Sequence, residues 1–310
     1  MNVVFMGTPQ FAVPSLEMLL AEGYSVVGVI TQPDRPQGRK KILTPTPVKE
    51  AALNHGLPVL QPVRLRAPEA VAEVAALEPD LIVTAAYGQI LPKSVLDLPK
   101  FGCLNVHGSL LPKYRGGAPI QRSIINGEKE TGVTLMYMAE GLDTGDMIAK
   151  VVVPIEYEDT SGTVFEKLST AGAGLLKEQL PLILDGKADR IPQNDEESTY
   201  APNLTRDDER IDWTSDAESI RNRVRGLLPF SGGFTLWNGD VFKIWELAAV
   251  KESGSGQAPG TVLSLSDKGI EVQAGSGTVL LTRVQPAGKK AMAAAEFVRG
   301  GQMKQGEVLS

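Results

Sequence analysis

The stretch GCLNVHGSLLPKYRGGAPIQR, residues 102–122, runs from an apolar, strand-like segment into a loop of glycine, proline and basic residues. Side chains alternate across a strand, so Asn105 and His107 are predicted to share one face at the strand's carboxyl end. Such a pair suits attack on a carbonyl carbon, because the histidine can move a proton while the asparagine stabilises the oxygen that becomes negative. The alternative interpretation is a loop histidine that closes a turn.

A catalytic histidine usually has a carboxylate beside it. The loop GLDTGD, residues 141–146, offers two, Asp143 and Asp146. Acidic residues next to glycine also form turns through their own backbone hydrogen bonds, and spacing alone does not choose between the two. The spacing matches no calcium loop, and one cysteine with two histidines supplies no zinc cluster, so no metal site is predicted.

Outward from this stretch, strand and helix patterns alternate along the first 150 residues. Near-continuous Val, Ile and Leu strands joined by helices predict a Rossmann-like, doubly wound, mostly parallel sheet, in which ligands bind beyond the carboxyl ends of the strands. The pattern then changes to an antiparallel edge pair and a long helix. The predicted strands are 2–7, 24–31, 57–62, 80–88, 101–108 and the pair within 132–155, and the predicted helices are 11–23, 45–56 and 161–186.

A second, smaller domain is predicted at the end of the chain. Residues 1–188 form the first domain, residues 189–206 are polar and weakly periodic and are interpreted as a linker, and residues 207–310 form the second domain. After one helix at 215–228, short strands repeat between turn residues. This pattern is typical of a small antiparallel barrel, and the five-stranded oligonucleotide-binding (OB-like) barrel fits it best.

Composition narrows the functional class. The 310 residues are 42% apolar and 22% charged, as in ordinary globular proteins, and no apolar run is long enough to span a bilayer, so no membrane partner is expected. The single cysteine suits a reducing compartment, which predicts a cytoplasmic location. The net charge of −6 lies in residues 1–205, whereas residues 206–310 carry 13 basic and 13 acidic residues. No heptad or swapping segment is seen, which favours a monomer.

A basic, proline-rich segment interrupts the first domain. PDRPQGRKKILTPTP, residues 33–47, carries four basic side chains among four prolines, and its composition predicts a long exposed loop without helix or strand. It is either a solvated charged loop or a clamp for a phosphate backbone. GTPQF, residues 7–11, lacks the glycine pattern of dinucleotide and phosphate loops, so a tight turn is predicted there instead.

Together these motifs resemble the methionyl-tRNA formyltransferase family of bacteria over nearly the whole chain. MGTPQFAVPSLEMLL resembles the family's opening strand and helix, and TQPDRPQGRKKILTPTPVKE its tRNA-contacting loop. AAYGQILP, NVHGSLLPKYRGGAPIQ, ETGVTLMYM and GLDTGDMI are similar to the folate formyltransferase core, and QPAGKKAM to a motif of the carboxyl-terminal domain. HGSLLPKYRG is shared with other folate formyltransferases, so it indicates the reaction more than the acceptor.

The resemblance implies formyl transfer from 10-formyltetrahydrofolate to the α-amino group of methionyl initiator tRNA, for translation initiation. It implies that the neutral amine attacks the formyl carbon, that Asn105 and protonated His107 stabilise the oxyanion, and that Asp143 rather than Asp146 orients the histidine. The folate donor would lie across Ala86, Tyr87, Gly88, Gln89, Ile90, Leu91, Ser109, Leu110, Leu111 and Pro112, and the tRNA would contact Arg35, Arg39, Lys40 and Lys41.

Four alternatives stay open at this point. A formyltransferase for a small acceptor, such as a nucleotide-linked amino sugar, shares the Asn/His/Asp core but gives no reason for the basic loop. A glycinamide-ribotide formyltransferase would usually lack the last hundred residues, and a folate-dependent hydrolase would use water as the acceptor. A non-catalytic RNA-binding protein with a degenerate α/β domain would have no need for Asn105, His107 and Asp143 together.

Overall fold

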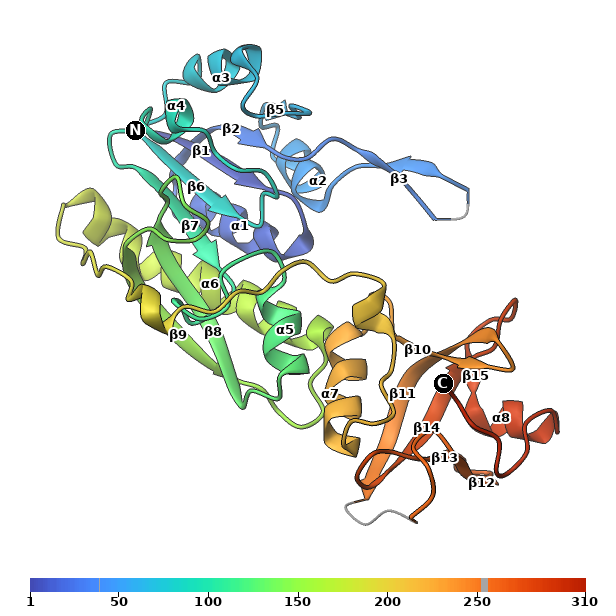
Figure 1. The fold of residues 1–310 in the computed structure, drawn as a ribbon. Helices are drawn as coiled ribbons and strands as arrows, with labels where there is room; N and C mark the ends of the chain where they lie inside the picture. Colours follow the sequence, from blue (N-terminus) through green and yellow to red (C-terminus); the bar gives the residue numbers. More distant parts are fainter. Residues whose placement is uncertain (39, 252–255) are drawn as a thin grey trace. The chain divides into compact units, whose positions relative to one another are not determined.

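The computed structural model describes residues 1–38, 40–251 and 256–310 (Figure 1). The chain forms two compact units. The first comprises Met1–Pro119, Glu130–Pro154 and Phe165–Ala201, and the second comprises Ile120–Lys129, Ile155–Val164 and Pro202–Ser310.

The first unit contains a seven-stranded sheet in the order β5-β2-β1-β6-β7-β8-β9. The strands β5, β2, β1, β6 and β7 pair in parallel, and β8 and β9 add an antiparallel edge, as the sequence predicts. The chain order reverses on either side of β1, so the switch point lies between β1 and β6. The bounds are β1 (Asn2–Gly7), β2 (Ser25–Ile30), β5 (Val59–Leu60), β6 (Leu81–Ala85), β7 (Cys103–His107), β8 (Glu130–Tyr137) and β9 (Met147–Pro154).

Helices connect or follow these strands, and local signals set where they begin. In α2 the Thr46 side chain accepts a hydrogen bond from the Lys49 N–H over 3.1 Å, and Pro47 occupies the first turn, where no backbone donor is needed. The bounds are η1 (Gln10–Ala12), α1 (Val13–Ala21), α2 (Pro47–Asn54), α3 (Pro68–Ala75), α4 (Lys93–Leu96), α5 (Pro119–Ile125), α6 (Ser161–Leu184) and η2 (Asp195–Glu197).

The single cysteine lies in the hydrophobic core beside the sheet. Cys103 is 3% exposed and packs in a cluster with Val4, Ile82 and Val95. Burial raises the pKa of its thiol to about 12, so it stays protonated and unreactive at neutral pH. Cys103 is therefore a core residue.

The basic segment is not free of regular structure, so that expectation was wrong. It forms a two-stranded antiparallel hairpin, β3 (Arg35–Gln37) with β4 (Ile42–Thr44), which extends from the first unit in Figure 1. A two-stranded ribbon tolerates Pro36, because each strand has a free edge where a missing N–H leaves no ladder bond unmade. Composition alone hid this, since the three-residue strands are too short to show alternation.

The second unit is an antiparallel sheet in the order β10-β11-β14-β13-β12, with β15 paired to β14. The last residues bridge its two edge strands: Val262 N–H bonds to the Glu307 carbonyl over 2.8 Å, and Ser310 exchanges two hydrogen bonds with Leu236. This bridging gives the sheet the barrel-like form that the sequence predicts. The bounds are η3 (Asp207–Glu209), α7 (Ala217–Leu227), β10 (Gly233–Trp237), β11 (Asp240–Lys251), β12 (Val262–Ser266), β13 (Gly269–Gln273), β14 (Thr278–Gln285), β15 (Met292–Ala293) and α8 (Ala294–Arg299).

One ion pair ties α5 to the segment before α7 within this second unit, and it predicts a pH dependence of stability. Nη1 and Nη2 of Arg122 donate to the two carboxylate oxygens of Asp208 over 2.7 and 3.0 Å, and this hydrogen bonding lowers the pKa of Asp208 to about 2. A lowered pKa stabilises the fold above the unfolded value of about 4, and the effect is lost as pH falls toward 2.

We therefore expect Arg122→Met to reduce the free energy of unfolding at pH 7, because the ion pair is lost. The expected size is roughly 1–2 kcal/mol, since solvent partly screens the pair. Urea unfolding between pH 7 and pH 3 should show the difference from wild type shrinking toward acid pH. Lys187→Met, which removes an exposed partner of Asp185, is the control and should change little. A difference that does not depend on pH would contradict the prediction.

Candidate active site

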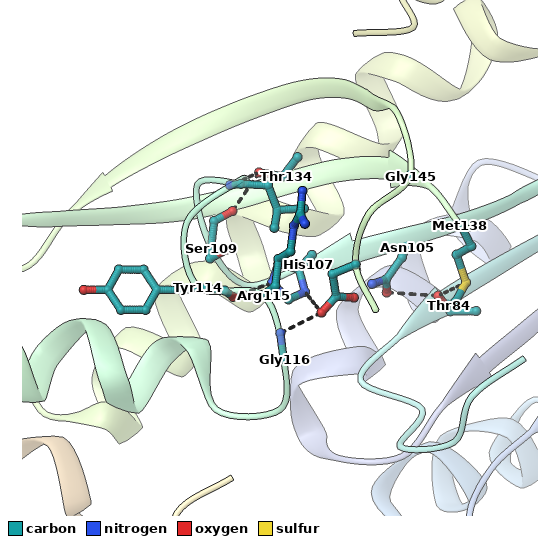
Figure 2. A network of polar contacts seen from close by, with 12 residues as sticks. Thr84, Asn105, His107, Ser109, Tyr114, Arg115, Gly116, Thr134, Met138 and Gly145 are labelled. Atoms are coloured by element: carbon teal, nitrogen blue, oxygen red, sulfur yellow. Dashed lines mark hydrogen bonds and ion pairs between the residues drawn. The ribbon is translucent and has the colours of Figure 1, made fainter. Parts of the chain in front are cut away.

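His107 is the last residue of β7, and its ring is buried. Its Nε2 lies 3.0 Å from the backbone carbonyl oxygen of Tyr114 (Figure 2). A carbonyl only accepts, so we assign the hydrogen to Nε2. The other ring nitrogen, Nδ1, faces the carboxylate of Asp143, with Oδ2 3.8 Å away. Tyr114 thus fixes the orientation of the ring, and in the neutral ring Nδ1 is the nitrogen that can accept a proton.

Asp143 reaches His107 because the loop after β8 folds back over the sheet. Tyr137, at the end of β8, pairs with Leu104 near the start of β7, so this loop begins at the end of β7 away from His107. Gly145 permits the fold-back, since a Cβ atom there would lie 1.8 Å from the Tyr137 carbonyl oxygen. Asp143 itself has φ +52°, a left-handed conformation that aspartate tolerates better than most residues.

A backbone donor holds the Asp143 carboxylate in place. The N–H of Gly116 donates to Asp143 Oδ2 over 2.8 Å. Because 3.8 Å is too long for a hydrogen bond, the carboxylate acts on the His107 ring through its charge. Any positive charge on Nδ1 therefore meets an anchored negative charge.

Asn105 lies two residues before His107 on β7, and its amide oxygen lies beside the Thr84 hydroxyl. Thr84 Oγ1 donates to Asn105 Oδ1 over 2.9 Å, and this hydroxyl also lies within hydrogen-bonding distance of the Leu104 carbonyl. In the part of the chain that the structure describes, Asn105 Nδ2 has no hydrogen-bond partner, so both its hydrogens remain available. Figure 2 shows Asn105 and His107 on β7 beside the loop that carries Gly145.

The two segments predicted to hold the donor follow β6 and β7, at the carboxyl edge of the sheet. Thr8, after β1, donates to the Tyr87 carbonyl over 2.9 Å, which joins the turn of residues 7–11 to the first segment at the switch point. Ile90 is 79% exposed. Of the other predicted donor residues, Ala86 and Gly88 are exposed, Gln89, Leu110 and Pro112 are half-buried, and Tyr87, Leu91, Ser109 and Leu111 are buried.

Some of these side chains serve the fold rather than a ligand. The Gln89 amide accepts from the Leu65 N–H over 2.7 Å and donates to the Pro62 carbonyl over 3.0 Å. Ser109 Oγ donates to the Lys113 carbonyl over 2.7 Å. Burial raises the pKa of Tyr87 to about 12, so its phenol stays neutral. The polar groups of Gln89 and Ser109 are therefore already paired within the fold, whereas Ile90 presents an apolar side chain to solvent.

The basic hairpin presents its cations to solvent. Arg35 lies on β3, and Lys40 and Lys41 lie in the turn, all exposed. Within the described residues none of the three has a carboxylate within ion-pair distance. Arg39 lies outside the described residues. Unpaired, exposed cations are what a phosphate backbone requires.

One residue that touches this site is not predicted from the sequence. Gln193 lies in the polar segment interpreted as a linker, yet its Nε2 donates to the carbonyls of Asp143 and Gly145 over 2.7 and 2.9 Å. About 50 residues separate the partners along the chain, and a lone polar side chain has no periodic pattern. No signal in one sequence could have revealed the contact.

Two general features bear on the chemistry. No group of three or more His, Cys, Asp or Glu side chains suited to a metal ion occurs among residues 1–38, 40–251 and 256–310. Over the same residues, no helix combines the length and apolar character needed to cross a membrane.

Comparison with known proteins identifies the family. The formyl transferase family matches residues 1–180, and its C-terminal domain matches residues 203–302. A methionyl-tRNA formyltransferase of Geobacillus thermodenitrificans is 57% identical over 300 residues, covering 96% of this chain and 94% of that protein. One of Bacillus subtilis is 54% identical over 309 residues, covering 99% and 97%. This chain belongs to the methionyl-tRNA formyltransferase family.

A solved structure supports the fold independently. The N-formyltransferase of Helicobacter canadensis, in complex with folinic acid and dTDP-3-aminofucose, has a TM-score of 0.69 at 21% identity, over 90% of this chain and 98% of that one. The predicted family, the enzyme class and the fold class are confirmed, and the chain is a formyl transferase.

The geometry at Tyr114 predicts the tautomer of His107. In the neutral ring Nε2 should carry the hydrogen and Nδ1 should not, because Nε2 faces a carbonyl. ¹⁵N NMR of histidine-labelled protein measures this directly, and the two rings are assigned with His55→Gln. A neutral ring protonated at Nδ1 would contradict the assignment.

Proposed function

We propose that this enzyme transfers the formyl group of 10-formyltetrahydrofolate to the α-amino group of methionyl initiator tRNA for translation initiation. The observation that carries the proposal is the meeting of Asn105, His107 and Asp143 at the carboxyl edge of the sheet, beside the two segments that follow β6 and β7. The relatives of this name, at up to 57% identity over nearly the full length, support the acceptor.

The proposed reaction assigns a role to each side chain. The amine nitrogen attacks the formyl carbon, a new C–N bond forms, and the formyl oxygen becomes negative. Asn105 Nδ2 and a protonated His107 Nδ1 stabilise that oxygen, while Asp143 balances the charge on the ring. When the intermediate collapses, the bond to the donor nitrogen breaks, the oxygen regains its double bond, and the attacking amine loses the proton that the donor nitrogen takes up.

The donor site in this proposal consists of residues 86–91 and 109–112. Both segments follow parallel strands at the sheet edge where ligands of such folds bind. Most of their side chains are buried or committed to the fold, so backbone groups would read the polar edge of the folate ring. The exposed Ile90 offers apolar surface for stacking.

The acceptor site combines local cations with an overall negative charge. Arg35, Arg39, Lys40 and Lys41 would meet phosphates of the tRNA. Residues 207–310, which carry almost none of the chain's net negative charge, would supply a second contact surface. In this proposal residues 1–188 are the catalytic domain and 189–206 the linker. An overall charge of −6 disfavours nonspecific binding of other polyanions. In this proposal the enzyme acts in the cytoplasm as a monomer.

His107→Ala tests the catalytic assignment. We expect kcat for formyl transfer to methionyl initiator tRNA to fall by about 10²–10³-fold, the usual cost of losing one oxyanion donor, with KM for the donor changed by less than about threefold. Radiolabelled formyl transfer in the steady state measures both constants.

His55→Ala is the matched control, because the side chain of this exposed histidine pairs with Glu17 at the surface, and the variant should keep full activity. Transfer to an amino sugar nucleotide but not to tRNA would overturn the acceptor and keep the chemistry. A fully active His107→Ala enzyme would overturn the site.

Replacing Lys40 and Lys41 with alanine tests the hairpin. We expect KM for the tRNA to rise about 10-fold and the salt dependence of log kcat/KM to become shallower by about 2, because two phosphate contacts are lost. Steady-state kinetics at salt concentrations from about 50 to about 200 mM measure both the KM for the tRNA and the salt slope. Alanine at Lys93 and Lys187 removes equal charge elsewhere and should leave both quantities unchanged; equal effects of the two pairs would argue against specific contact.

A further inference from the structure

We propose that Gln193 is a positioning residue for the formyl transfer described above, because its amide holds the loop that brings Asp143 to His107. The inference rests on the proposed function. It gives a role at the active site to the polar segment of residues 189–206, whose composition is that of a linker.

The Gln193 side chain uses its full hydrogen-bonding capacity. Its two amide hydrogens face the carbonyls of Asp143 and Gly145 at 2.7 and 2.9 Å. Its Oε1 accepts from Nε and Nη2 of Arg115 at 3.0 and 2.8 Å. Carbonyls only accept and a guanidinium only donates, so the amide has one possible orientation. A primary amide can donate to the two carbonyls and accept from the guanidinium at the same time.

Arg115 gives this amide a rigid support. Its side chain is 2% exposed, and a guanidinium so buried is stable only when its hydrogen bonds are made. Asp195 supplies the counter-charge at 2.8 Å. Arg115 immediately precedes Gly116, whose N–H binds the Asp143 carboxylate (Figure 2). The contacts therefore close a ring that runs from Arg115 through Gln193 and Asp143 to Gly116.

The segment that carries Gln193 is held on both sides of it. Ile191 exchanges two hydrogen bonds of 2.9 Å with Met147, at the start of β9. Further along, Thr199 accepts from the Arg115 N–H over 2.8 Å, and Ala201 donates to the Arg115 carbonyl over 2.6 Å. Residues 191–201 therefore bridge the loop after β8 and the loop after β7. Gln193 makes its contacts from a fixed backbone.

Gln193→Glu keeps the acceptor for Arg115 but removes the donors to the carbonyls of Asp143 and Gly145. Gln193→Glu has the same shape and keeps an oxygen for Arg115, but it places a second oxygen against two carbonyls. We expect the loop to shift and kcat to fall about 10- to 100-fold, with KM for both substrates within about twofold, because misplacing Asp143 acts on the reacting geometry rather than on binding. Asn203→Asp, an exposed amide-to-carboxylate change, is the control and should behave as wild type.

A double-mutant cycle with Asp143→Asn tests whether the effect passes through Asp143. Once Asp143 has lost its charge, adding Gln193→Glu should change kcat by less than about twofold. Effects that multiply would show that Gln193 acts by another route and would overturn the inference. Should the glutamate variant fail to fold, Gln193→Ala, which removes the same contacts without adding charge, serves in the same cycle.

A measurement without substrate keeps this inference separate from the proposed function. Amide hydrogen exchange of Gly116 should be about 10-fold faster in Gln193→Glu than in wild type, because the Asp143 acceptor is no longer held against its N–H. Unchanged exchange together with unchanged kcat would overturn the positioning role. Absence of formyl transfer by the wild-type enzyme, with exchange altered as expected, would overturn the proposed function alone.

Discussion

The arrangement at the active site depends on one hydrogen bond, from the backbone N–H of Gly116 to the carboxylate of Asp143. It joins two loops that leave the sheet at opposite ends of β7. A charged acceptor makes such a bond short and strong, and it compensates the carboxylate for lost water. Glycine is required at 116, because its φ is +115° and a Cβ atom would lie 2.8 Å from the Ala201 carbonyl oxygen. The first glycine of KYRGG, Gly116, is thus required for Asp143 to be held beside His107.

Alternation along β7 was enough to predict Asn105 and His107 as a pair, because a five-residue strand leaves little freedom in where its side chains point. Val/Ile/Leu strands joined by helices likewise predicted the parallel sheet and its carboxyl edge. Choosing Asp143 over Asp146 needed the family resemblance. The structure shows what spacing could not, which is a loop that reverses over the sheet at Gly145 and brings the first aspartate to the ring.

Two features were beyond prediction from one sequence, each for a physical reason. The hairpin of β3 and β4 has strands of three residues, which is below the length at which alternation becomes visible. Gln193 acts through single hydrogen bonds to backbone carbonyls far away in the chain. Backbone acceptors are the same at every residue, so neither the sequence around Gln193 nor that around Asp143 records the contact.

The orientation of His107 differs from that in serine-protease triads. There the acid hydrogen-bonds to Nδ1 and the working nitrogen is Nε2. Here a backbone carbonyl binds Nε2, and Nδ1 faces the acid across 3.8 Å. The Tyr114 carbonyl therefore holds the ring, and in the proposed reaction the acid contributes its charge at a fixed point. The strength of a charge interaction depends on the separation and on the local dielectric, so the position of the carboxylate in this buried site matters. Two groups control that position in the proposed arrangement: the Gly116 N–H binds the Asp143 carboxylate, and Gln193, which the buried Arg115 holds, binds the Asp143 carbonyl.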